Sequence, residues 1–415
     1  MMSPLTPRLP SPGSSSPASL RITLSCAASL LRSRSQQTLP RRVPQGRARL
    51  LTVFFLGLLS TLSAWSVSAE ERLRWQLLGD VSVSHEHLRG AEPTFRLGDL
   101  DLMFQASPGE RWQALGELML MDMAEVGEPA YHMHPARAYI EYLQSDALRL
   151  RFGQVHTPIG LYSQLYPHGG KIFEMTIHRP KLVVVEHGKE ILPLHSVGVM
   201  IHGLLVLSDT LELEYMTGLG NGGAHGGTDE NLWKSPYLNL RLYPRSLEGL
   251  SFGASAYLDV IDQAHTQRYE ELEQLILNAY LHYELFPCDL LIEGYWVQHQ
   301  ERGHHHATAH SETRGAAHGA THEGAHGADQ GGLYGGFGQL SYSVGDHSPF
   351  VMVEYFKRAR GDLLLSEHTP YVEYLAGHAG HRYYFSPQVL LKSGYRYEWY
   401  DQIHRFDLQL AFQLQ

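Results

Sequence analysis

Apolar and polar residues alternate along the chain after residue 70, in runs of about ten residues. In the stretch 389–399, Val389 and Leu391 fall on odd positions, while Lys392 and Arg396 fall on even positions. Successive side chains of a β-strand point to opposite faces, so each run predicts a strand with one apolar and one charged face. The final run, 405–414, repeats the same division.

Sixteen runs of this kind follow one another, and each predicts a β-strand. Their ranges are 73–84, 94–106, 111–122, 136–143, 148–154, 195–207, 211–217, 235–243, 250–259, 272–283, 290–300, 333–344, 349–357, 380–385, 389–399 and 405–414. At about 3.3 Å per residue and a 45° tilt, ten residues cross roughly 25 Å, the height of the apolar band of a membrane barrel.

The connections between these runs alternate in length. Seven are short turns, such as 107–110 and 145–146, and eight are mostly longer, such as 155–194 and 301–332. Short turns at one rim and long loops at the other are typical of outer-membrane barrels, whereas a soluble sandwich has no reason to alternate in this way. We therefore predict an all-β fold, a transmembrane antiparallel β-barrel of about 16 strands.

The first 69 residues show no such alternation. Four arginines between 41 and 49 precede an apolar run at 50–62, and Val67-Ser68-Ala69 resembles a cleavage site. This order predicts a secretory signal peptide, because the apolar run is shorter than the ~20 residues of a membrane-spanning helix. We expect residues 1–69 to be an N-terminal extension and signal peptide that are removed, and residues 70–415 to form the barrel.

Removal of that segment changes the charge balance. It contains eight arginines, so 25 of the 33 basic residues remain against 43 acidic residues, a formal charge of −18. This charge argues against a nucleic-acid partner and against a pore for anions. Cys288 is the single cysteine left after Cys26 is removed, which excludes a disulfide within the mature chain.

Charged residues of both signs fall on the face of the runs that we expect to point inward. Barrels of 16 to 18 strands leave an aqueous channel, which suits a charged lining. The alternative is the solvated face of a soluble sheet. The predicted pore-lining residues are Arg137, Glu141, Arg149, Arg151, Glu212, Glu214, Arg396 and Glu398.

The run at 148–154 continues into Gly153-Gln154-Val155-His156-Thr157-Pro158-Ile159-Gly160. Here the chain resembles the Gram-negative porins of the phosphate-selective O and P type, in which such a pattern leads from a strand into a loop that folds into the pore. The resemblance implies that 155–194, the third long loop, narrows the channel, with His156, Thr157, Pro158 and Gly160 in the constriction loop. It also implies a homotrimer. The chain differs in having few lysines.

Histidine is unusually abundant, and all 26 histidines follow the signal segment. Neutral imidazole combined with carboxylate suits Zn, Ni or Cu(II). Three interpretations of the loop 301–332 are open. It captures metal loosely at several sites, it forms a single ordered metal site, or it is a low-complexity loop that binds no metal. Its candidate ligands are His304, His305, His306, His310, His318, His322, His326 and Glu323.

Other histidines lie in or near long connections, and we expect them to gather around the same mouth of the barrel. They are His85, His87, His132, His134, His156, His168, His178, His187, His225, His265, His368, His378 and His381. His322-Glu323-Gly324-Ala325-His326 matches a metalloprotease pattern by letter, but a Gly/Ala/His tract offers no helix to present it. We expect no catalytic residues and no required cofactor. The ion that we expect to be bound is Zn²⁺.

These patterns predict a porin-like channel for small solutes in the outer membrane of a Gram-negative bacterium. Its histidine-rich extracellular face would bind divalent metal, zinc above all, and aid its uptake. The expected partners are outer-membrane lipid, small solutes or divalent cations, and two further copies of the chain. A non-conducting barrel for metal binding or adhesion remains an alternative, and a surface hydrolase is a third reading.

Overall fold

The computed structural model describes residues 73–86, 93–122, 131–166, 174–183, 192–222, 233–262, 271–301 and 330–415. The chain divides into two units, 1–66 and 67–415, and all of the first unit lies outside the described residues. Residues 67–72 lie outside the described residues as well, so the predicted extension and signal peptide, 1–69, stay a prediction.

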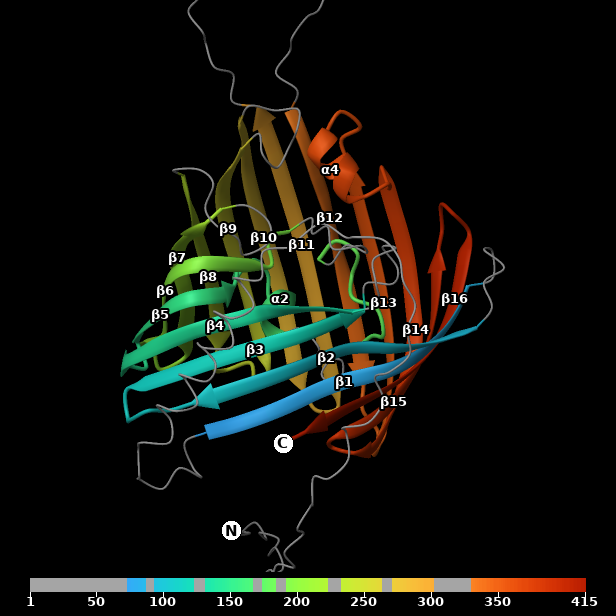
Figure 1. Cartoon of the computed structure of the whole chain (residues 1–415), viewed down its shortest axis with the longest axis horizontal. Coiled ribbons are helices and arrows are strands. Elements are labelled where there is room, and N and C mark those ends of the chain that lie inside the picture. The colour runs from blue at the N-terminus through green and yellow to red at the C-terminus, as the bar shows by residue number, and fades with distance from the viewer. Residues whose placement is uncertain are drawn as a thin grey trace, which may run out of the picture. The chain divides into compact units, whose positions relative to one another are not determined.

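Sixteen antiparallel strands close into one barrel (Figure 1), as the alternation predicted. Each strand pairs with its neighbours in sequence, and β1 pairs with β16 from Leu77 opposite Leu414 to Glu86 opposite Arg405. The strands are β1 (Leu73–Glu86), β2 (Thr94–Ala106), β3 (Trp112–Asp122), β4 (Tyr131–Ser145), β5 (Leu148–His156), β6 (His195–Ser208), β7 (Leu211–Asn221), β8 (Lys234–Pro244), β9 (Leu250–Asp262), β10 (Glu271–Leu285), β11 (Cys288–Glu301), β12 (Gln330–Tyr342), β13 (His347–Arg358), β14 (Glu373–Ser386), β15 (Val389–Glu398) and β16 (Ile403–Leu414).

The connections alternate between short and long, as predicted. Seven short turns lie at one end of the barrel together with Leu73 and Leu414, and we call this end the turn rim. The eight other connections lie at the opposite end, the loop rim, from which the third connection folds inward. Strand β14 begins at Glu373, seven residues before the predicted start, because its small residues Ala376 and Gly377 weaken the alternation there.

Apolar side chains cover the outer face of the barrel. In β11, Ile292 and Trp296 point outward and are 48% and 43% exposed, whereas Leu291 and Glu293 point inward and are buried. The pattern recurs around the wall, with Phe152 on β5 40% exposed. An apolar outer belt on a closed barrel is what a lipid bilayer requires, because every backbone group inside the belt bonds to a neighbouring strand.

Two short helices occur in the connections at the loop rim. Helix α2 (Tyr162–Leu165) follows β5, and α4 (Leu363–His368) follows β13. The Asp362 side chain accepts a hydrogen bond from the Leu365 backbone N–H, which caps the start of α4. Within the described ranges, no helix is long and apolar enough to cross a membrane.

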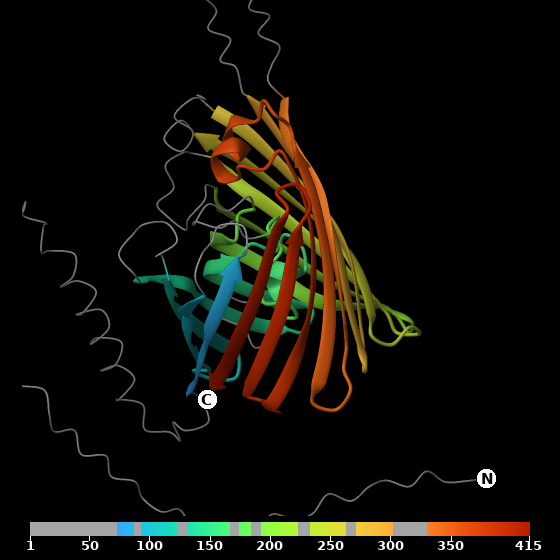
Figure 2. The same cartoon turned by 90° about the vertical axis from the view of Figure 1, so that its right-hand side faces the viewer.

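The third connection folds into the barrel, as predicted. Its described parts are 157–166, which includes α2, and 174–183. Figures 1 and 2 show this segment, in green, inside the ring of strands. We call the two described parts together the inner loop, and they contribute to the largest cluster of buried apolar side chains in the described structure.

Candidate functional site

The inner loop leaves the wall at the motif 153–160. The Thr157 N–H donates to the Leu194 carbonyl at 2.9 Å, which closes the base of the loop. Asn239 on β8 donates its side-chain amide to the Pro158 carbonyl at 3.0 Å, and the Gly160 N–H donates to Ser255 Oγ on β9 at 3.0 Å. These bonds direct the chain across the lumen immediately after β5. The predicted constriction residues therefore lie at the point where the loop turns inward.

Glu293 on β11 receives the start of α2. Its Oε1 accepts from the Leu161 N–H at 2.7 Å and from the Tyr162 N–H at 2.5 Å, and the Tyr295 hydroxyl donates to its Oε2. Gly160 has a φ of +75°, and a Cβ there would lie 2.3 Å from the Tyr295 hydroxyl oxygen. Only glycine fits this turn, since the space and the left-handed backbone both exclude a side chain.

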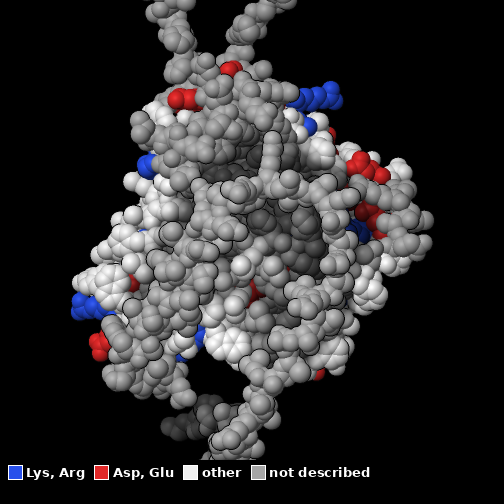
Figure 3. Space-filling model, viewed as in Figure 1, with Lys and Arg blue, Asp and Glu red and all other residues white. Residues whose placement is uncertain are grey.

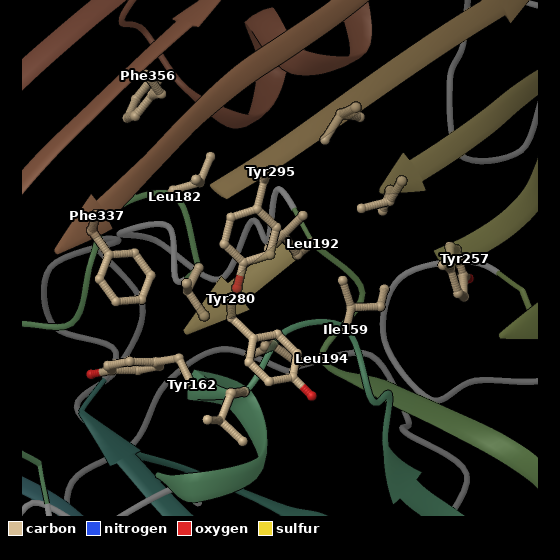
Figure 4. Close-up of a cluster of buried hydrophobic side chains, with 14 of the residues drawn as sticks. Ile159, Tyr162, Leu182, Leu192, Leu194, Tyr257, Tyr280, Tyr295, Phe337 and Phe356 are labelled. Atoms are coloured by element: carbon tan, nitrogen blue, oxygen red, sulfur yellow. The ribbon is translucent and has the colours of Figure 1, made fainter. Parts of the chain in front are cut away.

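Apolar side chains hold the inner loop against one half of the wall (Figure 4). Each large apolar side chain buried here contributes roughly 1.5–3 kcal/mol. The half of the lumen formed by β8–β14 is thus a packed core and not a water-lined surface. The loop contributes Ile159, Tyr162 and Leu182, joined by Leu192 and Leu194, and the wall contributes Tyr257, Tyr280, Tyr295, Phe337 and Phe356.

This apolar inner face departs from the expectation of a charged lumen. In β10, Ile276 and Tyr280 point inward beside polar residues, while Leu277 and Leu281 point outward. Large apolar side chains on the inner face of a strand must be covered. Ile276 and Tyr280 were therefore the available local signal for a loop lying against β10.

Lys181 holds the second part of the inner loop to the wall. Its backbone N–H donates to Glu354 Oε2 at 2.7 Å, and its ammonium nitrogen lies 3.2 Å from Glu398 Oε1. The same nitrogen lies 4.5 Å and 4.7 Å from the ring centres of Tyr371 and Tyr374. A cation over two aromatic faces, next to a carboxylate, is well stabilised despite its burial.

His178 and Lys392 form a second set of contacts around the same segment. His178 Nε2 lies 2.7 Å from Asp407 Oδ2 on β16. Lys392 on β15 donates to the carbonyls of Glu174 and Thr176, at 2.7 Å and 3.1 Å. Burial lowers the pKa of His178 to about 3, although the Asp407 carboxylate opposes this shift. The imidazole is therefore neutral in its contact at neutral pH.

The predicted pore-lining residues fall into two places. Arg396 and Glu398 lie under the inner loop, 2.6 Å apart and nearly fully buried. The other six lie on the inner face of β4, β5 and β7, beside the apolar core. We call these six, with His202, Arg241 and Tyr243 beside them, the polar strip. Its predicted members are Arg137, Glu141, Arg149, Arg151, Glu212 and Glu214.

Water reaches the part of the polar strip that lies on β5 and β7. The side chains of Arg151 and Glu212 are 22% and 23% exposed, whereas the apolar wall side chains under the loop are nearly all below 6%. Glu141 Oε2 lies 2.5 Å from Arg151 and 3.0 Å from His202, and Tyr243 donates to Glu214 at 2.6 Å. Figure 3 shows that the face turned to the viewer is hollowed near its centre.

The remaining members of the polar strip are paired as well. Arg137 bonds to the carboxylate of Glu117, and Arg149 Nη2 lies 3.0 Å from Asp146 Oδ1. Ion pairs of this kind fix the side chains along the wall, so the strip holds charges of both signs in defined positions. Whether these residues line a conducting path stays a prediction.

The predicted metal ligands lie outside the described residues. These are His304, His305, His306, His310, His318, His322, His326 and Glu323. Across the part of the chain that the structure describes, no group of three or more His, Cys, Asp or Glu side chains could hold a metal ion. The bound zinc therefore stays a prediction, and so does the absence of catalytic residues.

The other histidines do not all lie around the mouth as expected. His156 is half-buried at the loop-rim end of β5, with its ring centre 5.3 Å from that of His195. His178 and His378 lie inside the lumen, where His378 Nε2 is 3.0 Å from Glu354. The expectation for His378 was wrong because β14 starts earlier than its alternation suggested.

No protein-family model matches the chain, and no curated protein does. Among solved structures, OmpF of Salmonella typhi in complex with daunomycin is 11% identical, with a TM-score of 0.53 over 82% of this chain and 97% of its own. The chain has the fold of a Gram-negative outer-membrane porin. The trimer form of OmpT of Vibrio cholerae (9% identity, TM-score 0.51, 82% and 99% covered) and the anion-selective porin of Comamonas acidovorans (9%, 0.51, 82% and 98%) share it. The barrel is thus of the kind that resides in the outer membrane.

Proposed function

We propose that the chain is an outer-membrane channel through which small solutes pass along the polar strip. The observation that carries the proposal is the unequal lumen, because the charged side chains Arg149, Arg151 and Glu212 on β5 and β7 are open to water while the opposite half is packed. A solute path needs a wetted lining of this kind, because its polar groups can replace water molecules of the solute's hydration shell.

The test is conductance of the purified full chain in a planar lipid bilayer. Arg151→Glu reverses a charge in the polar strip, so it should shift the reversal potential in a salt gradient toward cation selectivity. Lys357 on β13 provides the matched control, since it is 45% exposed and pairs with Glu373 at the outer wall. Lys357→Glu should leave the reversal potential unchanged. Absence of conductance at any voltage would remove the channel proposal.

The second part of the proposal is that the histidine-rich segment 301–332 binds divalent metal, zinc above all, and aids its uptake. Its support is chemical, since seven imidazoles among carboxylates form a ligand set suited to zinc. Zinc titration compares the full chain with a tract variant, in which the seven histidines from His304 to His326 are replaced by asparagine. The tract variant should lose most of the bound zinc. Equal binding would exclude the segment as the main metal site.

The relation to the phosphate-selective O and P type also belongs to this proposal. Its support is the motif 153–160 at the point where the inner loop leaves the wall. Assembly as a homotrimer is proposed with it, and the trimer form of OmpT of Vibrio cholerae with the same fold supports it. Native mass spectrometry of the detergent-solubilised chain measures the copy number, and a monomer at all concentrations would overturn the trimer.

A non-conducting barrel for metal binding or adhesion is the second candidate, and the packed half of the lumen favours it. The inner loop is held by apolar contacts and by buried charges on β11, β13, β15 and β16, so it can act as a permanent plug. The bilayer experiment separates the two candidates directly. If the protein is a channel, the wild-type chain conducts. If the inner loop is a permanent plug, conductance appears only in variants that loosen the loop.

A further inference from the structure

Two histidines outside the histidine-rich segment meet on the outer wall of the barrel. His347 is the first residue of β13, and its Nδ1 lies 3.0 Å from Nε2 of His381 on β14. The ring centres are 5.1 Å apart. His381 stands between Gly380 and Arg382, which face the interior, so its ring points outward. His347 follows a short turn, which places the pair near the turn rim.

The separation of the two nitrogens matches that of two ligands on one metal ion. With metal–nitrogen bonds of about 2.0–2.1 Å, two imidazoles on the same ion hold their ligating nitrogens roughly 3 Å apart. The two rings already share one hydrogen in an N–H···N contact. When an ion enters, that hydrogen leaves the contact, and the ring that donated it carries its hydrogen on the other nitrogen. Both lone pairs then point at the metal.

The surroundings leave room for further ligands. The His347 side chain is exposed, and a hollow of about 480 Å³ on the outer wall borders His381. Tyr383 lies against His347, with ring centres 5.0 Å apart, and limits its rotation. This packing keeps the imidazoles in place, while water at the turn rim can reach the exposed His347 and complete the coordination of an ion.

We propose that His347 and His381 form a two-histidine metal site on the outer wall at the turn rim, which takes Zn²⁺, Ni²⁺ or Cu²⁺. The pair does not face the polar strip, so the site is separate from the proposed solute path, and neither histidine belongs to the histidine-rich segment 301–332. At the turn rim, β13 and β14 are not joined by a turn to each other. A bound ion therefore adds a side-chain link between two strands that pair here only through their backbones.

The experiment uses the detergent-solubilised tract variant, which removes metal binding by the seven tract histidines. Zn²⁺ is titrated by calorimetry, and Cu²⁺ is examined by electron paramagnetic resonance for coupling to imidazole nitrogens. We expect one ion per chain with two coupled nitrogens. His347→Ala and His381→Ala should each weaken binding by about tenfold or more. His404→Ala is the matched control, because His404 is also on the outer face of the barrel but bonds to Tyr395.

A thermal measurement distinguishes metal binding from a structural role of the rings. Zinc should raise the unfolding temperature of the tract variant and of its His404→Ala form, but not of the forms lacking His347 or His381. No ion bound by the tract variant would overturn the proposal. Binding that survives either substitution would overturn it too, since the ion would not be shared. None of these readouts depends on conductance or on the tract.

Discussion

The ammonium nitrogen of Lys181, on the inner loop, lies 3.2 Å from a carboxylate oxygen of Glu398 on β15. Arg396 lies 2.6 Å from the same oxygen. Removal of Glu398 leaves two buried cations without this carboxylate, whereas removal of Lys181 leaves Glu398 paired with Arg396. Breaking a buried pair costs roughly 3–5 kcal/mol. We therefore expect Glu398→Gln to loosen the inner loop more than Lys181→Met does.

Limited proteolysis with an enzyme that cuts after aromatic residues measures this difference. Tyr162 and Tyr166 are buried in the folded loop, so cleavage there reports its release. The rate should rise strongly in Glu398→Gln and modestly in Lys181→Met. Lys357→Met on the outer wall is the control and should behave as the wild type. Equal rates in all variants would mean that the ion pair does not hold the loop.

The carboxylate of Glu293 is expected to decide whether α2 stays against the wall. Glu293→Ala leaves the Leu161 and Tyr162 N–H groups without their acceptor, and each unpaired buried group costs about 1–3 kcal/mol. Glu293→Gln keeps one side-chain oxygen and should be milder. If the loop restricts the lumen, single-channel conductance rises in the order wild type, Glu293→Gln, Glu293→Ala.

Glu248 lies in the exposed turn between β8 and β9, so Glu248→Ala controls for the loss of one carboxylate. Its conductance should equal that of the wild type. A conductance unchanged in both Glu293 variants would show that the solute path does not pass the start of the loop. Barrel formation is checked by the shift in electrophoretic mobility on heating, which should persist in every variant.

Gly160 is expected to tolerate no side chain. Gly160→Ala places a Cβ against Tyr295 and Glu293 and also strains the left-handed backbone, so the loop should be displaced. Gly345→Ala separates these effects, because Gly345 has a φ of +58° but open space around it. We expect Gly345→Ala to cost about 1 kcal/mol of stability in urea unfolding. Gly160→Ala should cost several times more and expose Tyr162 to proteolysis.

Local patterns in the sequence were sufficient for the strands and their order. Alternation and turn residues act over two to ten positions, so each strand could be recognised without knowing its partner. The start of β14 was missed because Ala376, Gly377 and Ala379 carry little apolar contrast. The inward path of the third loop followed from a motif resemblance and not from periodicity.

The interior could not be predicted in the same way. The Leu161 N–H bonds to a carboxylate 132 positions later in the chain, and Lys181 bonds to one 173 positions later. Such contacts depend on barrel closure, which sets the faces opposite each other, and no single run of residues encodes them. From their charge, Arg396 and Glu398 were predicted to line a water-filled pore. In the structure the inner loop covers both.

Acidification is expected to weaken the docking of the inner loop through His178. Above pH about 6.5, the imidazole is neutral whether the loop is docked or free, so pH has no effect through it. Below that value a free ring takes up a proton, whereas burial keeps the docked ring neutral down to about pH 3. Docking therefore loses stability as the pH falls from about 6.5. At pH 5 the loss is up to about 2 kcal/mol, reduced by the 21% exposure of the side chain.

Proteolysis at Tyr162 and Tyr166, measured between about pH 7.5 and 4.5, tests this dependence. The wild type should become more susceptible as the pH falls, whereas His178→Gln, which cannot titrate, should give a flatter profile. The histidine-rich segment titrates in the same range, so both chains are also compared in the tract variant. In the tract variant, the pH profiles of the chain with His178 and of the His178→Gln chain must still differ, because the difference arises from the buried ring beside Asp407. Parallel profiles in the two chains would exclude His178 as the acid-sensitive contact.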